Sequence, residues 1–84
     1  MNNRQRLADS ILSWHGGGGS FMYQLGSHWY GDHNIGAEVI LGAIGEIDEL
    51  IFSPQRFFLD SKDVKELIVL KEKILREAKR EKLV

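Results

Sequence analysis

The stretch GAEVILGAIGEIDELIFS, residues 36–53, decides the fold class of this chain, because two periodicities run through it. Apolar residues recur at helical spacing, and the members of this stripe are Ile40, Ile44, Ile47 and Ile51. Gly42 and Gly45 oppose a helix, because each would cost a helix interior about 1 kcal/mol relative to alanine. The alternative is two strands, residues 37–44 and 47–53, joined by a tight turn at Gly45. We prefer the strands and predict an antiparallel hairpin here.

The preceding segment, residues 21–33, is rich in aromatic residues and glycine. Phe21 and Tyr23 alternate with polar or flexible residues, a period of two that places both on the inner face of a strand. Gly26 and the serine after it suit a two-residue hairpin turn. We therefore predict strands and hairpins over residues 21–53.

A helix is predicted on each side of this centre. Asn2 with Gln5 three residues later forms a capping box, which predicts a helix over residues 3–14. Asp60 is a natural N-cap for a long amphipathic helix over residues 61–82. The predicted fold is α+β, a small single domain of residues 1–84 with an N-terminal helix, short antiparallel hairpins and a long C-terminal amphipathic helix.

A glycine-rich loop follows the first helix, and its residues are Gly16, Gly17, Gly18, Gly19 and Ser20. With His15, its first three glycines resemble the oxyanion-hole motif of lipases and esterases. The chain has no G-x-S-x-G elbow and is far too short for that fold, so the resemblance implies no esterase. Backbone amides of such a loop can bind phosphate, but no P-loop lysine follows. We prefer a plain flexible loop, with a nucleotide or signalling-ligand site as the alternative.

Charge is divided along the chain. The net charge is −1, yet no lysine or arginine lies between Leu7 and Gln55. A nucleic-acid-binding protein normally presents a dominant basic face, and here only the C-terminal helix offers one. The chain has no cysteine, no signal peptide and no apolar run of about 20 residues, which predicts a cytoplasmic protein without membrane contact.

The candidate partner-binding surface combines the aromatic centre with an acidic turn. Aromatic side chains dominate interface hot spots, and Trp29 and Tyr30 are adjacent in a predicted strand, so one of them stays accessible. An acidic turn can meet a basic protein surface. The predicted surface comprises Tyr23, His28, Trp29, Tyr30, Asp32, His33, Glu46, Asp48 and Glu49.

Three of these residues are also candidate metal ligands. His28, Asp32 and His33 carry the imidazole and carboxylate groups that bind zinc or iron. Their spacing matches no standard closed site, so we predict no metal and no cofactor.

The function predicted from these features is that of a small non-catalytic binding protein. No complete catalytic set is present, so we expect no enzyme activity. The size and the Ile/Lys/Glu-rich composition are similar to those of accessory proteins of bacteriophages and mobile elements, which implies inhibition of a host protein or defence complex. A small core favours a homo-oligomer. The alternatives are an oligomer that binds a small molecule or metal through the glycine loop and histidines, and nucleic-acid binding through the basic C-terminal helix.

Overall fold

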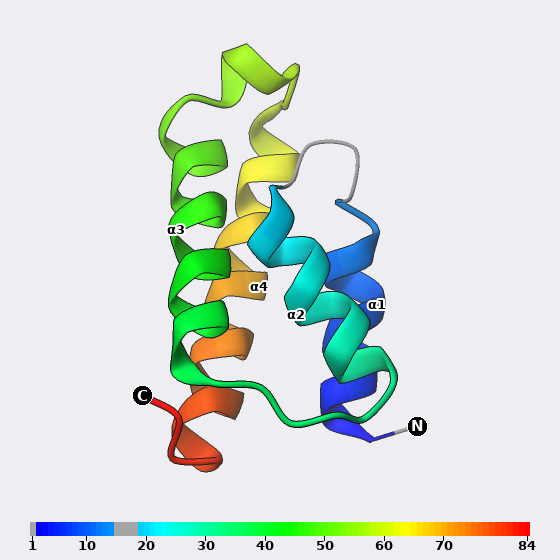
Figure 1. The fold of residues 1–84 in the computed structure, drawn as a ribbon. Helices are drawn as coiled ribbons and strands as arrows, with labels where there is room; N and C mark the ends of the chain where they lie inside the picture. The colour runs from blue at the N-terminus through cyan, green and yellow to red at the C-terminus, as the bar shows by residue number, and fades with distance from the viewer. Residues whose placement is uncertain (1, 15–18) are drawn as a thin grey trace.

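The structure is a computed structural model that describes residues 2–14 and 19–84. In these residues four α-helices run alternately up and down in a bundle (Figure 1). The elements are α1 (Asn3–Leu12), α2 (Ser20–Tyr30), α3 (Ala37–Phe52), the 3-10 helix η1 (Pro54–Phe57) and α4 (Ser61–Arg80). Each helix packs on the next along the chain, and α4 returns to α1 with less close packing.

The predicted α+β class is wrong, because the part of the chain that the structure describes contains no strand. Helices α2 and α3 cover most of residues 21–53, where hairpins were predicted. Gly26 lies inside α2 and Gly45 inside α3, so neither forms a turn. The helical isoleucine stripe was the correct one of the two periodicities in residues 36–53.

Close helix packing explains two of the glycines that suggested strands. A Cβ atom at Gly42 would overlap the ring of Phe21, so glycine lets α3 approach α2. A Cβ atom at Gly26 would likewise overlap the side chain of Leu12 in α1. The closer packing of the helices offsets the weak helix propensity of glycine. Among the described residues, no atom lies near enough to Gly45 to give it the same explanation.

The core lies between the four helices and includes one tryptophan. Trp29 of α2 is fully buried, together with Ile40 and Ile47 of α3 and Ile74 of α4. Burial of each large apolar side chain contributes about 1.5–3 kcal/mol relative to exposure. The isoleucine stripe of α3 therefore supplies a large part of the core.

The two flanking helices and their N-terminal caps agree with the prediction from the sequence. In α1, the side chain of Asn2 accepts from the N–H of Gln5 at 2.9 Å, and the Gln5 side chain accepts from the N–H of Asn2 at 3.0 Å. Asp60 and Asp63 form the equivalent box at the start of α4. The N–H of Asp63 donates to the Asp60 carboxylate and lowers its pKa. Among the helices of the described residues, none is long and apolar enough to cross a bilayer.

Candidate functional site

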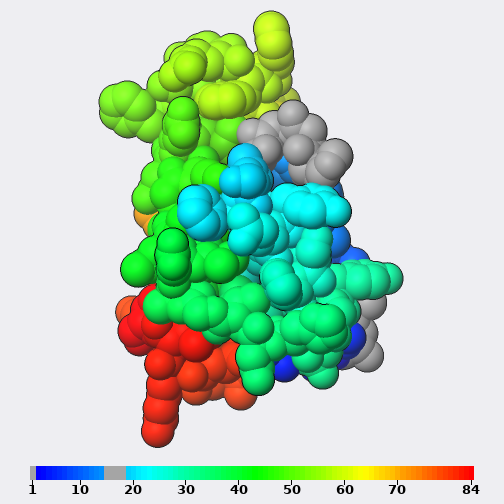
Figure 2. Space-filling view, viewed as in Figure 1, coloured from blue at the N-terminus to red at the C-terminus, as the bar shows by residue number. Residues whose placement is uncertain are grey.

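The connection between α3 and α4 exposes two phenylalanine rings at one end of the bundle. Phe52 is 88% exposed and Phe58 is 96% exposed, the highest values among the large apolar residues that the structure describes. We call this connection, residues 52–60, the tip. Figure 2 shows it projecting beyond the helices at the upper end of the molecule. Apolar rings exposed to this degree contribute almost nothing to burial, so folding does not explain them.

The backbone of the tip turns at Phe58 in a conformation that disfavours a phenylalanine. Phe58 has φ 58° and ψ 38°, in the left-handed region. That region costs most L-residues about 1–2 kcal/mol, and helix ends usually place glycine there. The turn is closed by the N–H of Leu59, which donates to the carbonyl of Pro54 at 3.0 Å. Phe58 therefore combines backbone strain with an exposed ring.

The base of the tip is anchored, so its rings have a defined position. Phe57 and Leu59 are half-buried and pack against the core. Arg56 lies over the Phe57 ring, with its guanidinium carbon 5.7 Å from the ring centroid. The capping box of Asp60 fixes the start of α4 directly after the turn. An anchored turn loses little conformational entropy when a partner binds it.

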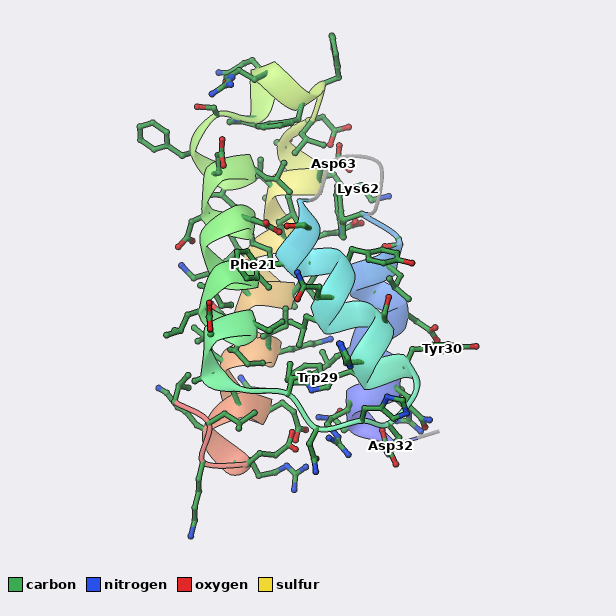
Figure 3. The ribbon with its side chains drawn as sticks, viewed as in Figure 1. Phe21, Trp29, Tyr30, Asp32, Lys62 and Asp63 are labelled. Atoms are coloured by element: carbon green, nitrogen blue, oxygen red, sulfur yellow. The ribbon has the colours of Figure 1, made fainter. Side chains whose placement is uncertain are left out.

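Charges around the tip balance. Arg56 in η1 and Lys62 in the first turn of α4 are exposed cations. Asp60 and Asp63 lie beside them in the capping box, and Figure 3 shows Lys62 and Asp63 at the start of α4. The tip therefore presents apolar rings without a net positive charge.

The predicted aromatic surface is divided between core and solvent. Trp29 points into the bundle and is fully buried, whereas Tyr30 points outward and is 54% exposed (Figure 3). Trp29 therefore belongs to the core and cannot contribute to a binding surface. Tyr23, which the strand period placed inside although it was also named for the predicted surface, is 55% exposed on α2. Phe21 is half-buried against α3. The strand period misplaced Tyr23 because the segment is helical.

The three candidate metal ligands do not assemble into a site. Asp32 forms an ion pair with Arg4 and also accepts from the Asn2 amide at 3.0 Å. His28 and His33 are exposed neighbours with ring centroids 6.1 Å apart. Within residues 2–14 and 19–84, no three histidine or carboxylate side chains come close enough to hold a metal ion.

The three acidic residues of the predicted turn lie on α3 and have separate roles. Glu46 accepts from the backbone N–H groups of Phe21 at 3.1 Å and Met22 at 2.8 Å. It thereby caps the N-terminus of α2, where a negative charge is favoured. Asp48 forms an ion pair with Lys71 of α4, and Glu49 is exposed. The acidic cluster is therefore partly structural.

The predicted ligand loop is only partly described. Gly19 is the N-cap of α2 and Ser20 is its first residue, and both are exposed. Gly16, Gly17 and Gly18, with His15, lie outside the described residues.

The sequence contained a signal for the tip that the prediction missed. Phe57, Phe58 and Leu59 form an apolar run between Pro54 and the N-cap Asp60, and a connection this short cannot bury all three. Connections between helices are normally polar. Comparison with protein-family models, curated proteins and solved structures finds no match for this chain. The functional proposal is therefore based on the geometry of the chain itself.

Proposed function

We propose that this chain is a non-catalytic protein-binding protein that inserts the rings of Phe52 and Phe58 into an apolar pocket of a protein partner. The observation that carries the proposal is the contrast between these rings, 88% and 96% exposed, and Trp29, which is fully buried. Transfer of each ring into an apolar pocket would contribute about 1.5–3 kcal/mol to binding. The two rings therefore have the properties of interface hot spots.

Backbone strain at Phe58 supports a role in binding. A glycine or asparagine would close the same turn at lower conformational cost. Strained residues gather at functional sites, where the surrounding structure keeps them in place. Phe57 and Leu59 provide that support by packing on the core. A phenylalanine at position 58 thus lowers stability and adds contact area only for a partner.

The shape of the tip favours a concave protein partner over a second copy of the chain. The Cα atoms of the molecule span 33 × 22 × 20 Å. A flat contact at this narrow end would reach only the end of the tip, whereas stable interfaces bury about 800 Å² on each side. A pocket that encloses the tip also contacts its sides.

The charge of the tip favours a protein over an anionic membrane. Membrane-binding segments carry several lysines or arginines that attract acidic lipids. Here Asp60 and Asp63 balance Arg56 and Lys62. Inhibition of a host protein or defence complex in the cytoplasm, as by an accessory protein of a bacteriophage or mobile element, remains the proposed biological role.

The test combines cross-linking with reconstitution. A photo-reactive phenylalanine analogue at position 58 identifies the partner, which is then purified and titrated with the purified chain. The Phe52→Ser/Phe58→Ser variant should bind at least 100-fold more weakly. The control Leu41→Ser, which removes a 57% exposed apolar residue from α3, should bind within about threefold of wild type.

Three results would contradict the proposal. One is equal binding by the double variant and the wild type in the reconstituted pair. The second is binding of the tip to vesicles of phosphatidylcholine and phosphatidylglycerol with no protein partner. The third is a dimer in sedimentation equilibrium that the double variant abolishes.

A further inference from the structure

A groove runs between α1 and α4, along the side of the bundle where neighbouring helices pack least closely. It consists of two hollows of about 390 Å³ and 370 Å³. Ser10 of α1 and Lys73 of α4 line both hollows, so the two adjoin each other along the groove. The groove starts near the tip, at Trp14 and Lys65, and extends to Asn3 and Arg80 at the opposite end.

Cations without a partner line this groove. Arg6, Lys73 and Arg76 form no ion pair within the described residues, and Lys65 adds a fourth such cation. Counting Arg80 as well, five cations face two carboxylates, those of Glu66 and Glu77, which leaves a net charge of +3 in a chain of net charge −1. The groove is therefore a positive channel on a molecule that is otherwise acidic.

Glu77 does not neutralise Arg6, Lys73 or Arg76, because its carboxylate is paired with Arg80 and Asn3. Burial would raise the pKa of Glu77, but hydrogen bonds from Arg80 and Asn3 outweigh burial and lower it. The Asn3 amide donates to Glu77 at 2.6 Å, and Arg80 forms an ion pair with the same carboxylate. Glu77 thus stays ionised with its own partners, and the charge of Arg6, Lys73 and Arg76 is left for a ligand.

Apolar side chains line the groove between the cations. Leu7 and Leu70 lie at its buried floor, and Val69, which is 48% exposed, lies in its wall beside Trp14. A ligand that fits must therefore offer both negative charges and apolar groups. Along α4 the lining runs from Lys65 to Arg80, about 22 Å at 1.5 Å per residue. An extended peptide rises about 3.3 Å per residue, so the groove accommodates six or seven residues.

We infer that this groove binds an extended, acidic peptide segment that carries interspersed apolar residues. Its carboxylates would pair with Arg6, Lys73 and Arg76, and its apolar residues would contact Trp14 and Val69. Nucleic acid fits less well, because the apolar floor offers no contact to a backbone that carries a phosphate at every nucleotide, whereas apolar peptide side chains can lie on it. The site is separate from the tip and does not depend on the function proposed for it.

Trp14 reports occupancy of the groove, because it lines the upper hollow whereas Trp29 is fully buried in the core. The probe is the peptide EELEDLE, with QQLQNLQ as the uncharged control and an eight-nucleotide oligothymidylate as the nucleic-acid probe. We expect saturable binding of EELEDLE that changes the fluorescence of Trp14, with at least tenfold weaker binding of QQLQNLQ. Trp14→Phe should remove the fluorescence change, while isothermal titration still detects binding.

Matched charge reversals test the position of the site. Arg76→Glu, in the groove, should weaken binding of EELEDLE at least tenfold. Lys79→Glu makes the same change of charge on an exposed residue outside the lining and should weaken binding no more than threefold. Phe52→Ser/Phe58→Ser should leave peptide binding unchanged, which separates this test from that of the tip.

The inference is overturned if EELEDLE does not bind, or if QQLQNLQ binds equally well. It is also overturned if Lys79→Glu weakens binding as much as Arg76→Glu does, because the attraction would then be general. Tighter binding of the oligothymidylate than of the peptide would assign the groove to nucleic acid instead.

Discussion

The two ends of this bundle differ in their surface groups: one end carries paired charges, and the other carries exposed phenylalanine rings. At the end opposite the tip, Arg4 of α1 pairs with Asp32 of the α2–α3 connection and, at 3.4 Å, with Glu81 after α4. Asn3 and Arg80 both donate to Glu77. We call this the closed end. It joins three segments through hydrogen bonds and ion pairs, whereas the tip exposes two phenylalanine rings.

This difference separates residues that stabilise the fold from residues that are left for a partner. Side chains at the closed end and in the adjoining core make their packing contacts and ion pairs inside the molecule, so their removal should lower the free energy of unfolding. The exposed rings of Phe52 and Phe58 lack such partners, so their removal should leave stability unchanged or higher. Mutations along the bundle should therefore show a gradient of effects on stability.

The largest effect is expected for Trp29→Ala in the core next to the closed end. Removing a fully buried tryptophan should lower the free energy of unfolding by about 3–5 kcal/mol, because a cavity replaces its contacts. Urea denaturation followed by circular dichroism measures this loss. Tyr30→Ala, at the 54% exposed neighbour, is the control and should cost less than about 1 kcal/mol. Equal losses for both variants would mean that Trp29 is not in the core.

A smaller effect with a defined pH dependence is expected for Glu77→Gln at the closed end. At pH 7 the variant should be about 1–3 kcal/mol less stable, because Arg80 and Asn3 lose a charged acceptor. The folded-state pKa of Glu77 is lowered, so its stabilisation is present above the unfolded-state pKa and is lost as pH falls through the folded-state pKa. The difference in the free energy of unfolding between wild type and variant should therefore reach its largest value above about pH 5 and should become smaller below about pH 4.

Denaturation at pH 7 and pH 3 tests this prediction. Asp48→Asn is the control, because the pair of Asp48 with Lys71 lies on the surface and contributes at most about 1 kcal/mol. Burial and the neighbouring carboxylate of Glu77 raise the pKa of Glu81. Glu81 therefore affects the pH dependence of stability with the opposite sign, since its stabilisation is lost as pH rises. A difference for Glu77→Gln that is the same at both pH values would contradict the account of this network.

The parts of the fold that depend on local chemistry could be predicted from the sequence. The capping boxes at Asn2 and Asp60 placed the starts of α1 and α4, because a cap involves residues only three apart. The centre could not be predicted in this way. Gly26 and Gly42 permit close contact with Leu12 and Phe21, and these contacts come from other helices. Helix propensity, which considers one residue at a time, predicts instead that these glycines disrupt a helix.

The candidate site was missed for a related reason. The strand period placed Tyr23 inside and left open which of Trp29 and Tyr30 stays accessible, and only the helical packing of α2 settles their positions. The exposure of Phe58 depends on the turn that η1 makes before α4. Only the apolar run from Phe57 to Leu59 in a short connection gave a sequence signal for the tip.

The most direct test of the central claim, that the tip serves binding and not folding, is the unfolding free energy of Phe58→Gly. Glycine relieves the left-handed backbone at φ 58°, so we predict a variant about 0.5–1 kcal/mol more stable than wild type, at a midpoint independent of protein concentration. The same variant should lose partner binding. A loss of about 1 kcal/mol or more would contradict the claim, because it would show that the ring of Phe58 stabilises the folded chain.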